Sequence, residues 1–436
     1  MLDIQFIRDN AELVAEKSAQ KGYKVDIPKL LEVDAERREL LTAVDALRAR
    51  RNENADKMKG AGGKPDQAVI DEGKQIKIEL AEREGYLAET EATYLALLKK
   101  VPNMPAADVP VGASEDENVE VKVWGEPTKF EFQPKNHWEI GEQRDWIDKE
   151  RAAKVTGARF AYLKGELVQL QFALIQFVLA TLTNQDVIQK LIDENGLNIQ
   201  AKAFTPILPP VMIREDIYDQ MDRLEPREDR YHLDGEDDNL WLIGSAEHTL
   251  GSMYADEILP ESQLPIRYIG YSTSFRQEAG TYGKDNEGIL RMHQFDKLEM
   301  EVFSTPETGL DEHKLLIALQ EYMVQQLGIP YHVLQKCTAD IGKPNARGVD
   351  IEAWLPGQDK YRETHTADYM TDYQSRRLKT RVKRADGHID LVHTNDATAF
   401  AMGRTMIAII ENFQTADGRV KVPAVLQPYL GGRSEI

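Results

Sequence analysis

Apolar and polar positions near the N-terminus repeat every three or four residues along two long stretches. In the first stretch, the repeating positions are Leu40, Val44, Leu47, Arg51, Asn54 and Met58. In the second they are Gly73, Ile76, Leu80, Arg83, Leu87, Thr90, Tyr94 and Leu97. This spacing is typical of coiled-coil seams, and the segment 60–65 between them, rich in glycine and ending in proline, breaks a helix. The pattern predicts an antiparallel helical hairpin whose helices, of roughly 30 residues, reach about 45 Å.

The pattern changes after the prolines of Val101–Pro105. We expect a helical arm over 1–105 with its tip near 59–66, a linker over 106–124 that includes the acidic stretch 115–120, and a second domain over 125–436. Alternation of apolar and polar residues predicts strands of an antiparallel sheet, and helical periodicity predicts helices between them. The predicted strands are 240–247, 266–275 and 289–303, and the predicted helices are 167–182, 311–327 and 399–412. The expected fold class is α+β, an antiparallel sheet flanked by helices behind an α-helical arm.

Charge separates the arm tip from the rest of the chain. The 436 residues include 54 Lys and Arg against 74 Asp and Glu, a net charge of −20, which argues against sequence-independent binding to nucleic acid. The tip has the opposite balance, with only Glu53 and Asp56 among six cations. It either binds a polyanion or forms an ordinary solvated surface. The six cations are Arg48, Arg50, Arg51, Lys57, Lys59 and Lys64.

Two features exclude other classes of protein. The one cysteine, Cys337, rules out an intrachain disulfide framework and a multi-thiolate zinc site, and a reducing compartment fits it. The most apolar run, 167–182, contains three glutamines and is shorter than the ~20 residues of a membrane span. We therefore expect a buried amphipathic helix there and no membrane segment.

The predicted strand 289–303 displays Arg291, Phe295 and Glu299 on one face, because side chains two apart share a face of a strand. Such a face suits an elongated ligand with an anion, a flat ring and an amine, although an ordinary solvated sheet face has the same pattern. A hairpin through the loop 281–288 brings Arg276 and Glu278 to the same sheet. Two arginines on one sheet indicate phosphate recognition, since guanidinium groups bind oxyanions in bidentate fashion.

Arg404 is the only charged residue between Ala397 and Ile410. A buried guanidinium without a partner is costly, so it faces either an anionic ligand or a buried carboxylate. The run itself leaves both alternatives open.

Several motifs, taken in order, resemble the class II aminoacyl-tRNA synthetases in their seryl version. Phe275–Gly280 followed by Arg291–Glu299 resembles the second signature of that class, and Gly403–Thr405 with Ile410–Asn412 resembles the third. Pro209-Pro210 resembles the first, which in the family lies at a dimer interface. Further seryl-type blocks are Ser245-Ala246-Glu247, Tyr361–His365 and Asp372–Arg377, and the predicted hairpin is similar to the arm that the seryl enzymes use on tRNA.

The resemblance implies a set of roles. Arg276 would bind the α-phosphate of ATP, Phe295 would stack on adenine beside Glu278, and Arg291 and Arg404 would bind the γ-phosphate. The implied ATP-binding residues are Arg276, Gln277, Glu278, Arg291, Phe295, Glu363, Thr364, His365, Thr366 and Arg404, with Mg²⁺ on Glu363 and Thr366. Glu352 is a nearby competitor for the metal or an ordinary strand-face carboxylate. The implied serine-binding residues are Ser245, Ala246, Glu247, Arg276, Glu299, Asp396 and Thr398, and the catalytic ones are Arg276, Glu299 and Arg404.

The resemblance therefore implies a cytoplasmic, homodimeric enzyme that adenylates L-serine with ATP and transfers it to tRNA(Ser), with tRNA(Sec) open as a second acceptor. The six cations of the arm tip would bind the tRNA. Three departures from the family pattern concern the amino-acid pocket: Ser245, Asp396 and the stretch 366–370. The alternatives are a paralogue that charges another acceptor, a non-catalytic tRNA-binding homologue and a coiled-coil scaffold.

Overall fold

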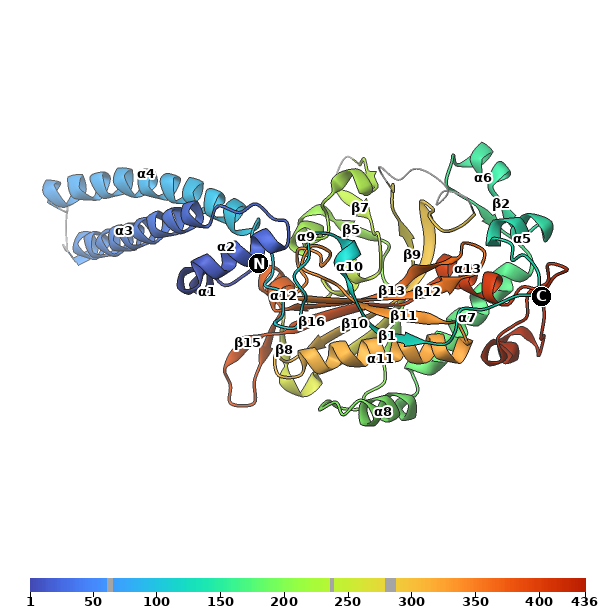
Figure 1. The fold of residues 1–436 in the computed structure, drawn as a ribbon. Coiled ribbons are helices and arrows are strands. Elements are labelled where there is room, and N and C mark those ends of the chain that lie inside the picture. The colour runs from blue at the N-terminus through green and yellow to red at the C-terminus, as the bar shows by residue number, and fades with distance from the viewer. Residues whose placement is uncertain (61–65, 236–238, 279–287) are drawn as a thin grey trace. The chain divides into compact units, whose positions relative to one another are not determined.

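The computed structural model describes residues 1–60, 66–235, 239–278 and 288–436, and it divides into two compact units, Met1–Met104 and Pro105–Ile436. The first unit is helical (Figure 1). Its two long helices have 34 and 32 residues and confirm the predicted antiparallel arm. The helices of this unit are α1 (Ile4–Asp9), α2 (Ala11–Gln20), α3 (Ile27–Gly60) and α4 (Gln67–Leu98).

The seam between α3 and α4 is apolar in its middle and polar towards the tip. Leu40, Val44 and Leu47 pack against Leu80 and Leu87, all buried. Nearer the tip, the amide nitrogen of Asn54 donates to the carbonyl oxygen of Val69 at 3.0 Å, a polar contact that pairs the helices in one register. Two predicted seam positions are wrong, because the side chains of Arg51 and Arg83 are exposed. Their long charged side chains stay in water, where no desolvation opposes them.

The second unit is built on a central antiparallel sheet. Its described strands follow the spatial order β1-β11-β12-β13-β16-β10-β9-β4, in which only the edge pair β4 and β9 is parallel. The strands are β1 (Val119–Trp124), β11 (Tyr331–Gln335), β12 (Arg347–Leu355), β13 (Lys360–Thr371), β16 (His393–Ala401), β10 (Gln294–Ser304), β9 (Ile266–Phe275) and β4 (Thr205–Ile207).

Smaller elements surround this sheet. The short sheets have the orders β5-β7-β6, β15-β14-β8 and β2-β3. Their strands are β2 (Ile147–Asp148), β3 (Tyr162–Leu163), β5 (Met212–Arg214), β6 (His232–Leu233), β7 (Leu240–Leu242), β8 (Ile258–Pro260), β14 (Arg381–Lys383) and β15 (Ile389–Leu391). The helices are α5 (His137–Gln143), α6 (Lys149–Val155), α7 (Glu166–Leu182), α8 (Gln185–Glu194), α9 (Glu215–Gln220), α10 (Glu247–Leu250), α11 (Gly309–Leu327), α12 (Tyr373–Leu378) and α13 (Met402–Asn412).

The core lies between one face of the central sheet and the helices α7, α11 and α13 (Figure 1). Leu298, Met300 and Val302 of β10 point into it and are fully buried. The alternating positions Glu299 and Glu301 therefore point to the opposite face, which is left for chemistry. No single helix among the described residues is long and apolar enough to cross a membrane, and the consecutive pair α7 and α8, which passes by length and composition, is bent by 67°.

Several predicted boundaries are corrected. The predicted strand 289–303 begins at Gln294, so Arg291 precedes it, and the predicted strand 240–247 ends at Leu242 before the helix α10. The predicted helix 399–412 is shorter, because β16 continues to Ala401. The last six residues of the predicted linker 106–124 form a strand: β1 pairs with β11 at the sheet edge, since its valines alternate in the manner of a strand.

Candidate active site

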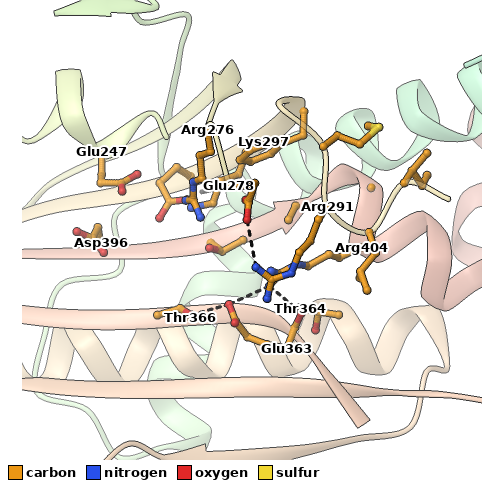
Figure 2. Close-up of a pocket in the computed structure, with 18 of the residues that line it drawn as sticks. Glu247, Arg276, Glu278, Arg291, Lys297, Glu363, Thr364, Thr366, Asp396 and Arg404 are labelled. Atoms are coloured by element: carbon orange, nitrogen blue, oxygen red, sulfur yellow. Dashed lines mark hydrogen bonds and ion pairs between the residues drawn. The ribbon is translucent and has the colours of Figure 1, made fainter. Parts of the chain in front are cut away.

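A cavity lies on the polar face of the central sheet (Figure 2). In this view Glu247 and Asp396 lie towards one end, and Arg404 and Glu363 lie towards the other. The cavity brings together residues that are up to 181 positions apart in the chain, from Arg223 to Arg404. The predicted site residues that line it are Glu247, Arg276, Glu278, Arg291, Phe295, Glu299, Glu363, Thr364, Thr366, Asp396, Thr398 and Arg404.

Arg276 follows β9 directly and is held by the neighbouring backbone. Its N–H donates to the carbonyl oxygen of His293 at 3.0 Å, and its Nε donates to the carbonyl oxygen of Gly244 at 3.1 Å. The guanidinium carbon lies 5.4 Å from the centroid of the Phe295 ring, within the range of a cation–π contact. The cavity thus offers a fixed cation beside an aromatic face, which suits a ligand that has both a phosphate and a flat ring.

Arg291 and Glu278 form an ion pair that also lines the cavity. Nη1 of Arg291 donates to Oε2 of Glu278 at 3.1 Å, and both side chains are partly accessible, at 34% and 15% exposure. Glu278 has a φ of 50°, a left-handed conformation that is uncommon for a residue with a side chain. Its carbonyl oxygen accepts a hydrogen bond from Nη1 of Arg159 at 2.7 Å, which fixes the backbone at this residue. The predicted loop 281–288 lies, except for its last residue, outside the described residues.

Arg404 lies in the first turn of α13 and faces a carboxylate. Its Nη1 is 3.0 Å from Oε1 of Glu363 and also donates to the backbone carbonyl oxygen of Glu363 at 2.9 Å. The hydroxyl of Thr366 donates to the same carboxylate at 3.3 Å. Burial alone would raise the pKa of Glu363, but Arg404 and Lys336 lower it to about 2. Of the two alternatives open for Arg404, the structure shows the carboxylate pair, and the pair opens onto the cavity.

Glu299 and Glu247 mark the other end. Glu299 is 2% exposed, and burial raises its pKa to about 8 although Lys297 opposes this. Nζ of Lys297 lies 2.5 Å from Oε2 of Glu299 and donates to the Ser245 hydroxyl at 2.8 Å. Burial would also raise the pKa of Glu247, but the charges of Lys297 and Arg223 outweigh it and hold this pKa well below its usual value. Two carboxyls with different protonation preferences therefore face one small space, where they can bind a cation such as an ammonium group.

Asp396 lies next to this pair on β16. Its Oδ2 accepts a hydrogen bond from Nη2 of Arg223 at 2.9 Å, and both side chains are largely buried, at 7% and 17% exposure. Burial raises the pKa of Asp396 to about 7, opposed by Arg223 and aided by Glu247 and Asp368. Thr398, two residues further along β16, lies directly opposite Glu299 in the strand pairing. Polar groups suited to a small hydroxylated ligand therefore surround this end of the cavity.

Comparisons with known proteins match both units. The seryl-tRNA synthetase N-terminal domain matches residues 1–105, and the tRNA synthetase class II core domain (G, H, P, S and T) matches residues 230–413. A serine–tRNA ligase from Symbiobacterium thermophilum is 40% identical over 437 residues, with 98% of each chain covered. The chain belongs to the seryl-tRNA synthetase family.

Solved structures of the family have the same fold. The seryl-tRNA synthetase of Pyrococcus horikoshii, complexed with ATP, matches with a TM-score of 0.86 at 37% identity and covers 100% of this chain and 99% of its own. The cytoplasmic serine–tRNA ligase of Naegleria fowleri, in complex with AMP, matches with a TM-score of 0.82 at 27% identity, covering 100% and 98%. These matches confirm the predicted fold class, an α-helical arm with a class II catalytic domain.

Four residues carried over from the family pattern do not line the cavity. His365 points to the opposite face of the sheet, where its ring packs against Phe400, and Gln277 donates outward to the carbonyl oxygen of Arg230. Ser245 and Ala246 are fully buried, and Ser245 contacts the cavity residues Lys297 and Glu299 through hydrogen bonds. A fifth candidate, Glu352, accepts a hydrogen bond from His332 at 2.7 Å and is an ordinary strand-face carboxylate.

Three charged residues of the cavity were not predicted as site residues. Lys297 was placed on the correct strand face, and its position between Phe295 and Glu299 was the signal that could have selected it. Asp368 lies in the stretch 366–370 that departs from the seryl pattern. No pattern in the sequence marked Arg223 as a site residue, because it lies in a segment without periodicity and its partner Asp396 is 173 residues away.

The cations of the arm tip differ in how they are paired. Nη2 of Arg48 contacts Glu84 at 2.8 Å, and Nη2 of Arg50 lies 3.8 Å from Glu72. Within the described part of α3, the exposed Arg51, Lys57 and Lys59 have no ion pair. Lys64 lies outside the described residues. The unpaired cations therefore gather towards the end of α3.

Proposed function

We propose that the cavity binds ATP and L-serine, joins them as seryl-adenylate and passes the seryl group to the 3′ end of tRNA(Ser). The chain is a serine–tRNA ligase, a class II aminoacyl-tRNA synthetase. The observation that carries the site assignment is the convergence of Arg276, Arg291, Arg404 and Glu363 on one cavity. Three guanidinium groups around one space suit a triphosphate, which presents several oxyanions.

ATP is proposed to lie between the two ends of the cavity. The Pyrococcus horikoshii relative is complexed with ATP and the Naegleria fowleri relative with AMP. In this chain, the ring of Phe295 would stack on adenine, with Glu278 beside it, and Arg276 would contact the α-phosphate. Arg291 and Arg404 would hold the γ-phosphate. Phosphate binding then requires each arginine to exchange part of its carboxylate pairing for phosphate oxygens, which the partial exposure of both pairs permits.

Mg²⁺ fits the donor set of this site. Glu363 has a pKa of about 2 and is ionised, and the Thr366 hydroxyl lies beside it at 3.3 Å. Magnesium prefers hard oxygen ligands and takes few from protein, the rest coming from phosphates and water. Glu363 and Thr366 would hold the ion, and its bound charge would neutralise phosphate oxygens during the reaction.

Serine is proposed to occupy the end that contains Glu247 and Glu299. The two carboxyls would receive its ammonium group, and Asp396 and Thr398 would face its hydroxyl. The serine carboxylate attacks the α-phosphorus, a new carboxylate oxygen–phosphorus bond forms, and the bond to the β-phosphate oxygen breaks with release of pyrophosphate. The attacking carboxylate is already ionised at neutral pH, so Arg276 contributes alignment and charge neutralisation rather than proton transfer.

The helical arm is proposed to hold the tRNA. Arg51, Lys57 and Lys59 are exposed on α3 and suit contact with phosphates, as do Arg48, Arg50 and Lys64. In the second step a ribose hydroxyl at the 3′ end of the tRNA attacks the adenylate carbonyl, and AMP leaves. Whether tRNA(Sec) is a second acceptor is decided by charging assays with both transcripts.

A homodimer in the cytoplasm completes the proposal. Leu208, at the end of the edge strand β4, is 78% exposed, and Phe172 on α7 is 54% exposed. Leu208 directly precedes the Pro209-Pro210 motif, and exposed apolar side chains suit a subunit interface. Sedimentation equilibrium tests this directly, and a monomer at micromolar concentration would contradict it.

The alternatives are less favoured. A paralogue that charges another acceptor would not need an arm for tRNA binding, and this chain has both long helices of the arm. A non-catalytic homologue would be indicated by the loss of Arg276, Arg404 or Glu363, and all three are present around one cavity.

The decisive experiment is ATP–pyrophosphate exchange measured with each standard amino acid. We expect serine to support exchange and threonine, alanine and cysteine to support little. Faster exchange with another amino acid would overturn the serine assignment, and no exchange with any amino acid would overturn the activity. Exchange without subsequent charging of tRNA(Ser) would leave adenylation intact and refute the acceptor.

A further inference from the structure

Three carboxyl side chains form a row across three neighbouring strands at the serine end of the cavity. In the antiparallel pairing, Glu301 of β10 lies opposite Asp396 of β16, and Asp396 lies opposite Asp368 of β13. Directly opposed side chains have Cβ atoms about 4.5–5.5 Å apart, and like charges in such positions repel each other. Neither carboxyl oxygen of Glu301 has a hydrogen-bond partner among the described residues. A cation beside the row relieves this repulsion.

Arg223 supplies that cation from outside the central sheet. It follows α9, and its backbone carbonyl oxygen accepts a hydrogen bond from Nε of Arg230 at 3.2 Å, which fixes the segment. Its Nη2 reaches the middle carboxyl, Asp396, at 2.9 Å. Two other cations lie nearby. Lys297 is engaged by Ser245 and Glu299, and Lys336, whose charge acts on Asp368, forms ion pairs with Asp340 and Asp350. Arg223 is thus the ion-pair partner of Asp396 in the described part of the chain.

We propose that Arg223 is a positioning residue that sets amino-acid specificity, by neutralising and orienting Asp396 so that the site accepts a hydroxyl rather than an ammonium group on the side chain of the substrate. The inference rests on the proposed function, in which Asp396 faces the serine side chain. Arg223 does not take part in the transfer of any group.

Charge is decisive in this small buried space. With Arg223 in place, Asp396 belongs to a neutral pair and can still accept a hydrogen bond from a neutral hydroxyl. Without it, Asp396 loses its ion-pair partner, since Lys336 acts on Asp368 at the end of the row, and a substrate that carries a positive charge becomes the natural partner of Asp396. L-2,3-diaminopropionate is serine with an ammonium group in place of the hydroxyl, so it probes this change with little alteration in size.

A purely structural ion pair would behave differently. Loss of a structural contact lowers the stability of the fold and the rate with every amino acid together. Loss of a residue that sets specificity changes the relative kcat/KM values for different amino acids. This change is reversed when the carboxylate left without its partner is also removed. The ratio of kcat/KM for serine to that for L-2,3-diaminopropionate separates the two, because folding losses cancel in it.

The test is ATP–pyrophosphate exchange with L-serine and with L-2,3-diaminopropionate on the full chain at neutral pH. The proteins compared are the wild type, Arg223→Met, Arg223→Lys, Asp396→Asn and the double variant Arg223→Met/Asp396→Asn. Arg227→Met is the matched control, since Arg227 forms an exposed ion pair with Glu215 at 3.0 Å and does not line the cavity. Thermal melting of each protein checks that it is folded.

We expect Arg223→Met to raise KM for serine by about 10- to 100-fold, the effect of one charge-assisted hydrogen bond, with a smaller change in kcat. The preference should shift towards L-2,3-diaminopropionate, the double variant should recover most of the serine KM, and Arg223→Lys and Arg227→Met should keep the wild-type preference. The proposal would be overturned if Arg223→Met left the ratio of kcat/KM for serine to that for L-2,3-diaminopropionate unchanged. It would also be overturned if the double variant recovered none of the serine KM. If Arg223→Met does not fold, an altered ratio in Asp396→Asn supports the proposal and an unaltered one refutes it.

Failure of the proposed function has a separate signature. A wild-type protein that activates another amino acid instead of serine would refute the serine assignment. The response of the Arg223 variants to charged and neutral forms of that amino acid would still test the role of the pair.

Discussion

The ion pair between Arg267 on β9 and Glu312 on α11 joins the central sheet to its helix layer. The side chains are 0% and 1% exposed. Nε and Nη2 of Arg267 donate to the two carboxylate oxygens, each at 2.8 Å. The guanidinium also donates to the backbone carbonyl oxygens of Gln200 and Lys202, which precede β4. Burial raises the pKa of Glu312 and Arg267 offsets only part of this rise, so the pair is sensitive to the loss of either charge.

Glu312→Gln removes one charge and leaves a guanidinium buried without its counter-ion. Breaking a buried pair in this way costs about 3–5 kcal/mol of folding free energy. The roughly 330 residues of Pro105–Ile436, at about 2.1 cal/mol/K each, have an unfolding entropy of about 0.7 kcal/mol/K. Dividing the free energy by this entropy, we expect the melting temperature to fall by about 4–7 °C.

Differential scanning calorimetry at neutral pH measures this shift. The matched control is Glu307→Gln, which makes the same chemical change in an exposed pair, where Glu307 is 61% exposed and lies 2.8 Å from Arg384. Exposed pairs contribute about 0–1 kcal/mol, so the control should lower the melting temperature by no more than about 1 °C. Equal shifts in the two variants would refute the reasoning, because burial would then make no difference to the pair.

Three further predictions concern activity and pH. Arg276→Ala should lower kcat for serine-dependent exchange by about 100- to 1000-fold, as loss of one preorganised charge does, and near-wild-type exchange would contradict the phosphate role. Deletion of residues 35–95 should leave exchange intact and abolish charging of tRNA, so a deleted protein that still charges tRNA would remove the arm from the partner assignment. Burial lowers the pKa of His332, but hydrogen bonds to Glu352 and Glu120 raise it above its usual value. The stabilisation by protonated His332 is therefore full below about pH 6.5 and is lost as the pH rises through the raised pKa. The melting temperature of His332→Gln should differ most from that of the wild type in acid. A difference that stays constant across pH would be inconsistent with this.

Local periodicity was enough to predict the arm and the polarity of the strands. The seam residues Leu40, Val44 and Leu80 are buried as their spacing predicted, because a helix exposes one face at a fixed interval. The bounds of β9 match the predicted 266–275, since alternation is also a local property. The order of the motifs likewise identified the family, which the comparisons confirm.

Periodicity could not predict where strands begin or bulge. Between β12 and β13 the register shifts, so that Ile351 pairs with His365 but Glu352 pairs with Glu363. This inserts Thr364 as an extra residue and lets Glu363 and Thr364 both line the cavity, whereas strict alternation would place Glu363 on the face of His365. A bulge re-aims side chains through the pairing of two strands, and that pairing is not visible in either strand alone.

The sequence by itself thus determined the helical arm, the alternating faces of the main strands and the set of residues capable of binding a triphosphate. Only the tertiary structure decided which charges meet, as with Arg404 and Glu363 or with Arg223 and Asp396. The physical reason is the distance along the chain over which each interaction acts. Helix and strand periodicity arise from bonds between near neighbours, whereas ion pairing in the cavity depends on the register of strands and loops from distant parts of the chain, and burial decides how strongly each pair interacts.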